Sequence, residues 1–312
     1  MKILAGLLAL SPSFPLAATA RQDHAAFQGL SQGEAVFDAS AKAELEVQRS
    51  KAGLLLVRPV VNGHEAGWFI FDSGAGICVV STPRAEALEL IAAGDLPATG
   101  VGGESATTAL RASTLVLGPL TLRDVPLMKT DLSFLEVPLG VEIAGIIGYG
   151  VLSQCIVELD LAAPRIALHD PRGYELAAGE WTPLEFDDLI PTVFATCEGR
   201  RGRYHLDLGS NGGLTFQEPA VRRYNLLEGR ELTDVKLGGV GGTVACKQGR
   251  VAWLELANVR LADLEAIFPL EAKGIEAQDG RDGSIGTKVL ESFVLTLDYP
   301  GRRICFRARA GK

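Results

Sequence analysis

Two halves of this chain carry the same short motifs in the same order, and this internal duplication constrains the fold more than any other feature. Asp72 follows the apolar run 68–71 and precedes Ser-Gly, while Asp207, 135 residues later, precedes Leu-Gly-Ser. Each aspartate is followed by a Gly-Val-Gly-Gly stretch and then by an apolar-Gly turn. The distance along the chain is 76 residues from Asp72 to Gly148 and 79 residues from Asp207 to Gly286. Motifs repeated in one order at nearly one spacing indicate a repeated structural unit.

The local pattern in both halves is that of short β-strands that end in turns. Residues 68–71 are four aromatic or β-branched residues in a row, which favours a strand covered on both faces. Asn62-Gly63 predicts a tight hairpin whose return strand is residues 68–71. Thr82-Pro83 predicts the opening of a short helical stretch at residues 85–90. Residues 143–157 are apolar, but the segment is shorter than the ~20 residues of a membrane span. Its glycines favour a strand-turn-strand. We expect an all-β fold of two lobes with a cleft between them.

The chain divides accordingly into two lobes and three smaller segments. We assign residues 51–170 to the first lobe and residues 189–310 to the second. The Pro-, Gly- and acid-rich residues 171–188 form the predicted link between them. A length of 312 residues leaves room for a core in each lobe. Residues 21–50 hold few core residues and are predicted to be an arm or linker, whether a leader, a short helix or a mobile segment.

The N-terminus has the three-part pattern of a secretory signal. Lys2 precedes the apolar residues 3–10, and Ala18-Thr19-Ala20 has the small-x-small form of a cleavage site. Residues 1–20 are therefore predicted to be a signal peptide that is cut near Ala20, with the mature protein periplasmic or secreted. The apolar run is too short for a stable membrane span. An uncleaved N-terminal helix is the alternative.

Composition argues against several classes of function. With 38 acidic and 30 basic residues the net charge is −8, and no basic run suggests a nucleic-acid partner. The five cysteines lack metal-ligand spacing and are expected to be buried thiols. The alternative is one disulfide, and the odd number of cysteines would still leave at least one thiol free. His205 is expected to pack in a strand. Neither a G-x-S-x-G elbow nor a phosphate loop occurs. The sequence predicts neither a metal nor a cofactor.

The paired motifs resemble those of a known family. Asp-Ser-Gly at 72–74 and Asp-Leu-Gly at 207–209, each followed by an apolar-Gly turn, resemble the aspartic proteases. The likeness is greatest to the bacterial retropepsin-like branch, here in a two-lobed plan similar to pepsin, and it extends over about residues 51–310. It implies two homologous acid-protease-type β-barrel lobes. Asp72 and Asp207 would then line the floor of the cleft.

The resemblance also implies roles for individual residues. Asp72 and Asp207 would form a catalytic dyad that shares a proton and activates a water. Ser73 would brace the dyad, and Ser210 would donate a hydrogen bond to its own aspartate. Gly74 and Gly209 would let the two backbones approach each other. The glycine-rich stretches are candidate flaps over the cleft, with a surface turn as the alternative: Gly100, Val101, Gly102 and Gly103 in the first half, and Gly239, Val240, Gly241 and Gly242 in the second.

These roles predict an exported aspartic endopeptidase that acts as a monomer, without cofactor, on a peptide or protein substrate. Leu208 departs from the family, which has Ser or Thr there to supply the second brace. The first alternative is therefore a non-catalytic peptide-binding protein with a degenerate second lobe. The other alternative is a structural envelope protein in which Asp-Ser-Gly is incidental. Asp282, in a further Asp-Gly-Ser, aligns with Ala144 and is expected to be a turn residue.

Overall fold

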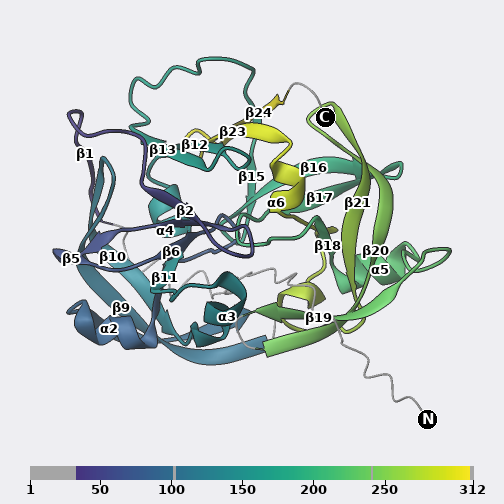
Figure 1. Ribbon diagram of the computed structural model, residues 1–312, viewed down its shortest axis with the longest axis horizontal. Helices are drawn as coiled ribbons and strands as arrows, with labels where there is room; N and C mark the ends of the chain where they lie inside the picture. The colour runs from purple at the N-terminus through teal and green to yellow at the C-terminus, as the bar shows by residue number, and fades with distance from the viewer. Residues whose placement is uncertain (1–32, 101–102, 240–241, 310–312) are drawn as a thin grey trace, which may run out of the picture.

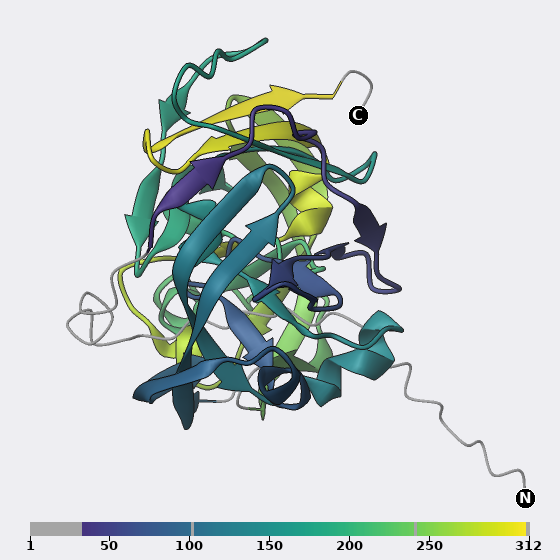
Figure 2. The ribbon, with the colours of Figure 1, turned by 90° about the vertical axis from the view of Figure 1, so that its left-hand side faces the viewer.

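The computed structural model describes residues 33–100, 103–239 and 242–309. These residues form two β-lobes that lie side by side, with a further sheet across one end of both (Figures 1 and 2). The predicted all-β, two-lobed class is confirmed. The predicted signal peptide 1–20 lies outside the described residues, as do four candidate flap residues: Val101, Gly102, Val240 and Gly241.

The first lobe is built on an eleven-stranded sheet. Strand β1 pairs with β10 and β2 pairs with β3, so residues 35–37 and 47–49 of the predicted arm join this sheet. Its strands are β1 (Ala35–Phe37), β2 (Val47–Arg49), β3 (Leu55–Val57), β4 (Val60–Val61), β5 (His64–Glu65), β6 (Phe69–Phe71), β7 (Val79–Ser81), β8 (Ile91–Gly100), β9 (Gly103–Leu117), β10 (Leu120–Thr130) and β11 (Gly145–Ile147). Its helices are α2 (Thr82–Ala87), η1 (Ser133–Leu135), α3 (Glu136–Leu139) and α4 (Tyr149–Leu152).

The second lobe is built on an eight-stranded sheet with the same central pairing. In lobe one β6 runs parallel to β11, which is antiparallel to β7. In lobe two β17 runs parallel to β22, which is antiparallel to β18. The strands are β15 (Glu185–Asp187), β16 (Ile190–Cys197), β17 (Arg200–Leu206), β18 (Leu214–Phe216), β19 (Thr233–Gly239), β20 (Gly242–Leu256), β21 (Val259–Pro269) and β22 (Gly283–Ile285). The helices are α5 (Glu218–Arg223), η2 (Gly274–Ala277) and α6 (Thr287–Leu290).

A five-stranded sheet joins the lobes in the order β13-β12-β23-β24-β14. At its centre Glu158 lies opposite Thr296, and these are the residues that the sequence repeat aligns. The two strands that the sequence repeat aligns therefore pair with each other where the lobes join. The predicted link contributes β14 to this sheet and β15 to lobe two. The strands are β12 (Ile156–Asp160), β13 (Arg165–His169), β14 (Thr182–Pro183), β23 (Phe293–Asp298) and β24 (Arg303–Ala308).

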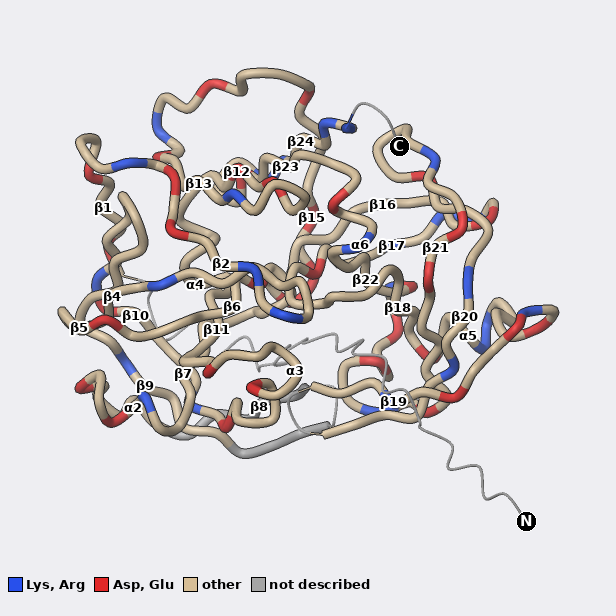
Figure 3. The backbone as a smooth tube through the Cα atoms, in the orientation of Figure 1, with Lys and Arg blue, Asp and Glu red and all other residues tan. Residues whose placement is uncertain are grey.

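Strand β6 shows how the sequence builds the core. Successive side chains of a strand point to opposite faces, and here both faces are covered. Phe69 and Phe71 enter the large core, while Ile70 enters a separate apolar cluster of lobe one. All five cysteines are buried and free. Lys and Arg are interspersed with Asp and Glu along both lobes (Figure 3). Within the described ranges, none of the helices has the length and apolar character needed to cross a bilayer.

Candidate active site

Each predicted aspartate lies directly after the central strand of its lobe. The backbone N–H of Asp72 donates to the Ile147 carbonyl, and that of Asp207 donates to the Ile285 carbonyl, both at 3.0 Å. These bonds extend the parallel pairings β6–β11 and β17–β22 by one residue. The apolar-Gly turns found in the sequence are therefore the elements that hold the two aspartates in place.

The two aspartates meet between the lobes. Gly74 N donates to Asp72 Oδ1 at 2.7 Å. Gly209 N donates both to Asp207 Oδ1, at 3.0 Å, and across the lobe boundary to Asp72 Oδ1, at 2.9 Å. The two carboxyl groups are close enough for each to influence the titration of the other. Both side chains are buried, with 0% of Asp72 and 2% of Asp207 exposed.

The glycine that ends each three-residue aspartate motif faces the carboxyl of the opposite lobe. A Cβ atom at Gly74 would lie 2.7 Å from Asp207 Oδ1. A Cβ atom at Gly209 would lie 2.3 Å from Asp72 Oδ2. Both separations are below van der Waals contact, so glycine is the residue that lets the two loops come this close.

Ser73 braces the site across the lobes. Its hydroxyl donates to the Leu206 carbonyl at 2.6 Å and accepts from Leu208 N at 3.1 Å. Leu208 occupies the matching place in lobe two, but its side chain is buried in the large core and has no hydroxyl to return these bonds. The brace therefore comes from one side chain instead of two.

Removing the Ser73 hydroxyl should measurably weaken the fold. Ser73→Ala leaves the Leu206 carbonyl and the Leu208 N–H buried without this partner, which typically costs about 1–3 kcal/mol. We expect the free energy of unfolding, measured by chemical denaturation, to fall by about that amount. Ser73→Thr keeps the hydroxyl and serves as the control. An Ala variant as stable as the Thr variant would contradict the bracing role.

Ser210 acts on Asp207 through its backbone. Its N–H donates to the Asp207 carboxyl, while its hydroxyl accepts weakly from Gly212 N at 3.5 Å. Its carbonyl accepts from both the N–H and the hydroxyl of Thr287, each at 2.9 Å. Ser210 thus connects the dyad loop to the apolar-Gly turn behind it.

Burial and mutual repulsion shift the titration of both aspartates. Burial raises the pKa of Asp72 well above its usual range, and the charge of Asp207 raises it further. Burial raises the pKa of Asp207 to about 7, against the lowering effect of the Gly209 and Ser210 N–H groups and of Arg281. Two carboxyls this close share one proton and titrate as a unit.

These shifts predict that the dyad destabilises the fold as pH rises. A raised folded-state pKa means that its stabilising contribution is complete below the unfolded value of 3.8 and is lost as pH rises through about 7. We expect the free energy of unfolding to fall over this window in the wild type. Asp207→Asn removes one titrating group and should flatten the slope. Equal slopes in thermal or chemical unfolding across this pH range would contradict the assignment.

A buried polar cluster beside Asp207 was not predicted from the sequence. A cavity with free volume of about 10 Å³, the space of a single water, is lined by residues that include Asp207, Gly74, His205, Glu276 and Arg281. Gln217 Nε2 donates to Glu276 Oε2 at 3.0 Å. His205, expected to be a packing residue, lies with its Nε2 3.5 Å from Asp187 Oδ2. The sequence signal was the polar residue in a strand position where lobe one has an isoleucine.

The four candidate flap glycines that the structure describes lie at the ends of long antiparallel strand pairs. Gly100 pairs with Gly103 where β8 meets β9, and Gly239 pairs with Gly242 where β19 meets β20. In lobe one, β8 and β9 approach η2 of lobe two, which carries Glu276 beside the dyad. The position suits a flap, and this role stays a prediction.

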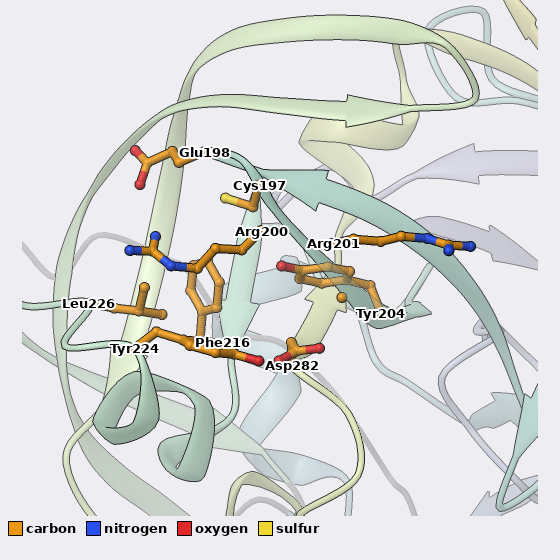
Figure 4. A pocket seen from close by; sticks show the side chains of 10 residues that line it. Cys197, Glu198, Arg200, Arg201, Tyr204, Phe216, Tyr224, Leu226 and Asp282 are labelled. Atoms are coloured by element: carbon orange, nitrogen blue, oxygen red, sulfur yellow. The ribbon is translucent and has the colours of Figure 1, made fainter.

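Several other cavities of the described chain lie away from the two aspartates. Figure 4 shows a pocket in lobe two whose lining includes Arg200, Tyr204, Tyr224 and Asp282, with a free volume of about 10 Å³. Its lining includes none of the residues predicted for the dyad. Asp282 Oδ2 accepts from Arg203 N at 2.9 Å, as a structural residue does. In the described ranges no group of three His, Cys, Asp or Glu side chains is arranged to hold a metal ion.

Comparison with known proteins supports an aspartic protease family for the first lobe. Residues 57–151 match a family described as aspartyl protease, and this segment contains Asp72 and the Gly148 turn. No curated protein matches the sequence. Among solved structures, the chain is similar to the crystal structure of basic 7S globulin from soybean. That similarity has a TM-score of 0.47 and 12% sequence identity, and it covers 88% of this chain and 95% of that chain.

Proposed function

We propose that the chain is an exported aspartic-type endopeptidase in which Asp72 and Asp207 form the catalytic dyad. The observation that carries the proposal is the Gly209 N–H, which donates to an oxygen of each carboxyl. Through this shared donor the two lobes hold their carboxyl groups side by side, as an acid pair requires. The family match of the first lobe supports the same activity.

The arrangement suits general acid–base hydrolysis of a peptide bond. The ionised carboxyl takes a proton from a water held between the pair, and the water oxygen attacks the peptide carbonyl carbon. The protonated carboxyl donates to the carbonyl oxygen as the tetrahedral intermediate forms. A proton then passes to the amide nitrogen, the C–N bond breaks, and the two products leave. This chemistry requires no cofactor.

Substrate access to the buried dyad requires movement of the segments that cover it. The β8–β9 hairpin is the best candidate, since it reaches across to η2 of the other lobe. We assign it the role of a flap that opens for an extended peptide and then closes. Closure would exclude bulk water and strengthen the electrostatic interactions of the dyad.

A non-catalytic peptide-binding protein is the second candidate, and Leu208 is the observation that favours it. Replacing Leu208 with Thr would supply the missing hydroxyl opposite Ser73. For an active enzyme with a loosened dyad we expect Leu208→Thr to raise kcat/KM by a few-fold, the equivalent of about 1 kcal/mol for one added brace. Leu208→Val, which adds no hydroxyl, is the control. No gain over Leu208→Val would favour the binding protein.

Export and a monomeric state complete the proposal. The signal-like residues 1–20 motivate export, and the presence of both aspartates in one chain motivates activity as a monomer. N-terminal sequencing of the protein recovered from the periplasm or medium should place the cut near Ala20. A protein retained in the cytoplasm with Met1 intact would contradict export.

A further inference from the structure

The two lobes differ on one face beside the dyad. In lobe one this face is apolar and belongs to the cluster that contains Ile70 and Ile146, which pair across β6 and β11. In lobe two the same paired positions are His205 and Ser284, across β17 and β22. The matched residues on this face are Ile70 and His205, Ile143 and Arg281, and Ile146 and Ser284. A buried guanidinium therefore lies on one side of a dyad whose other side is hydrocarbon.

Arg281 is held firmly in this position. Only 3% of the residue is exposed. Its Nη2 donates to the Ile275 carbonyl at 3.1 Å, and its Nη1 lies 3.7 Å from Asp187 Oδ2. Its Nε finds no hydrogen-bond partner among the described residues. The side chain lines the same cavity as Asp207 and Gly74, so its charge acts on the dyad through little intervening solvent.

Backbone donors do not by themselves favour one aspartate as the anion. Asp72 accepts from the N–H groups of Gly74 and Gly209, and Asp207 accepts from those of Gly209 and Ser210. Both donors to Asp72 bind Oδ1, and Oδ2 receives none from the described residues. Asp72 Oδ2 is thus the oxygen best placed to carry a proton. The difference that decides which of the two aspartates is ionised must therefore come from the surrounding charges.

The ionisable groups near Asp72 differ in charge from those near Asp207. Tyr299, near Asp72, stays neutral because burial raises its pKa well above the usual value. On the other side, burial lowers the pKa of His205 to about 4, so His205 is neutral too. Asp187 stays ionised, because His205, whose Nε2 lies 3.5 Å from Asp187 Oδ2, helps lower the pKa of Asp187 to about 2.

Two further groups act on Asp207 in opposite directions. The charge of Arg281 lowers the pKa of Asp207. Glu276 is coupled to Asp207 by repulsion, and burial raises the pKa of Glu276 to about 7. Two more charges act on these neighbours of Asp207. Asp188 acts on Arg281, and Arg203 acts on both His205 and Asp187.

We propose that Arg281 is a positioning residue that makes Asp207 the ionised member of the dyad and leaves the shared proton on Asp72. The proposal rests on the proposed function for its consequence. In the reaction, Asp207 takes the proton from water and Asp72 donates to the peptide carbonyl oxygen. Two loops in matching places of the two lobes thereby perform different tasks because of one buried charge outside the repeated motifs.

The test is a carbon-13 NMR titration of aspartate carboxyls, which needs no turnover. Asp72→Asn and Asp207→Asn each leave one dyad carboxyl, which identifies its signal. In the Asp72→Asn background, where Asp207 is the remaining dyad carboxyl, Arg281→Met should raise the pKa of Asp207 by about one unit. In the same background Glu276→Gln should lower that pKa. In the Asp207→Asn background, both substitutions should shift the pKa of Asp72 by less. Arg222→Gln, which removes a charge that is 76% exposed on α5, is the control and should change neither.

The outcomes separate this inference from the proposed function. Equal shifts at the two aspartates, or shifts of the same sign in Arg281→Met and Glu276→Gln, would overturn the role of Arg281 whether or not the protein cleaves peptides. If Arg281→Met fails to fold, Arg281→Lys keeps the charge and should leave Asp207 nearly unchanged, while Glu276→Gln still tests the sign. If the chain is active, the acid limb of its kcat/KM profile should move in the same directions.

Discussion

Either Asp72→Asn or Asp207→Asn should reduce peptide cleavage by about 10²–10⁴-fold, the usual contribution of general acid–base catalysis. Asparagine has the same shape as aspartate and keeps an acceptor for the Gly74 or Gly209 N–H, so the fold should persist. It can neither take a proton from water nor share one with its neighbour. The measurement is kcat/KM on a peptide mixture from acid to neutral pH, with circular dichroism as the check on folding.

Asp282→Asn provides the matched control. Asp282 belongs to an Asp-Gly-Ser that looks like a dyad motif, yet its carboxylate accepts from Arg203 N away from the dyad. Its variant should retain near wild-type activity. Loss of activity in Asp72→Asn alone would indicate that two chains pair their first lobes. Full activity in both dyad variants would exclude Asp72 and Asp207 as the catalytic pair.

Gly209→Ala should be the most damaging change that leaves every titrating group in place. The added methyl carbon would lie 2.3 Å from Asp72 Oδ2 and 2.4 Å from Asp72 Cγ, so the loops must move apart. Overpacking of this kind typically costs about 1–3 kcal/mol of stability. Separation of the carboxyls should also lower kcat/KM by at least about 100-fold, because it disrupts the shared proton.

Gly212→Ala tests whether this effect is specific to the close approach. A methyl group there would meet only the Ser210 hydroxyl, at an ordinary 3.7 Å. We expect near wild-type stability and activity from this variant. If Gly209→Ala and Gly212→Ala behave alike in denaturation and in peptide cleavage, the packing of Gly209 against Asp72 does not matter for the site.

The meeting of the two aspartates could be predicted because their surroundings are local and repeated. Each follows a buried strand and precedes a tight turn, and the turn that holds it recurs at a similar distance downstream. The short helix after Thr82-Pro83 and the Asn62-Gly63 hairpin were predictable for the same reason, since their signals lie within a few residues. Both are present, as α2 and as the β4–β5 turn. The predicted return strand was wrong, however: it is His64–Glu65, while β6 pairs with β3 and β11.

The polar cluster could not be predicted because its members are distant in sequence. His205 lies in β17, but Asp187 belongs to β15 and Arg281 to the segment before β22, and the sequence pattern does not reveal that the three meet. The expectation that His205 simply packs in its strand therefore missed its ionic neighbours. Strand β8 was equally hard to predict, because it contains Gly94, Asp95 and Pro97, residue types that are rare in strands. Residues 35–37 and 47–49 were missed because strands of three residues carry little periodic signal.

The central claim is that one chain supplies both carboxyls of one site. Titration with a tight-binding peptide that carries a tetrahedral hydroxyl in place of the scissile bond tests it most directly, with stoichiometry read by calorimetry and native mass spectrometry. We expect one inhibitor per chain in a monomeric complex, with binding lost in Asp72→Asn and in Asp207→Asn. One inhibitor per two chains, or full binding by Asp207→Asn, would contradict the two-lobed dyad.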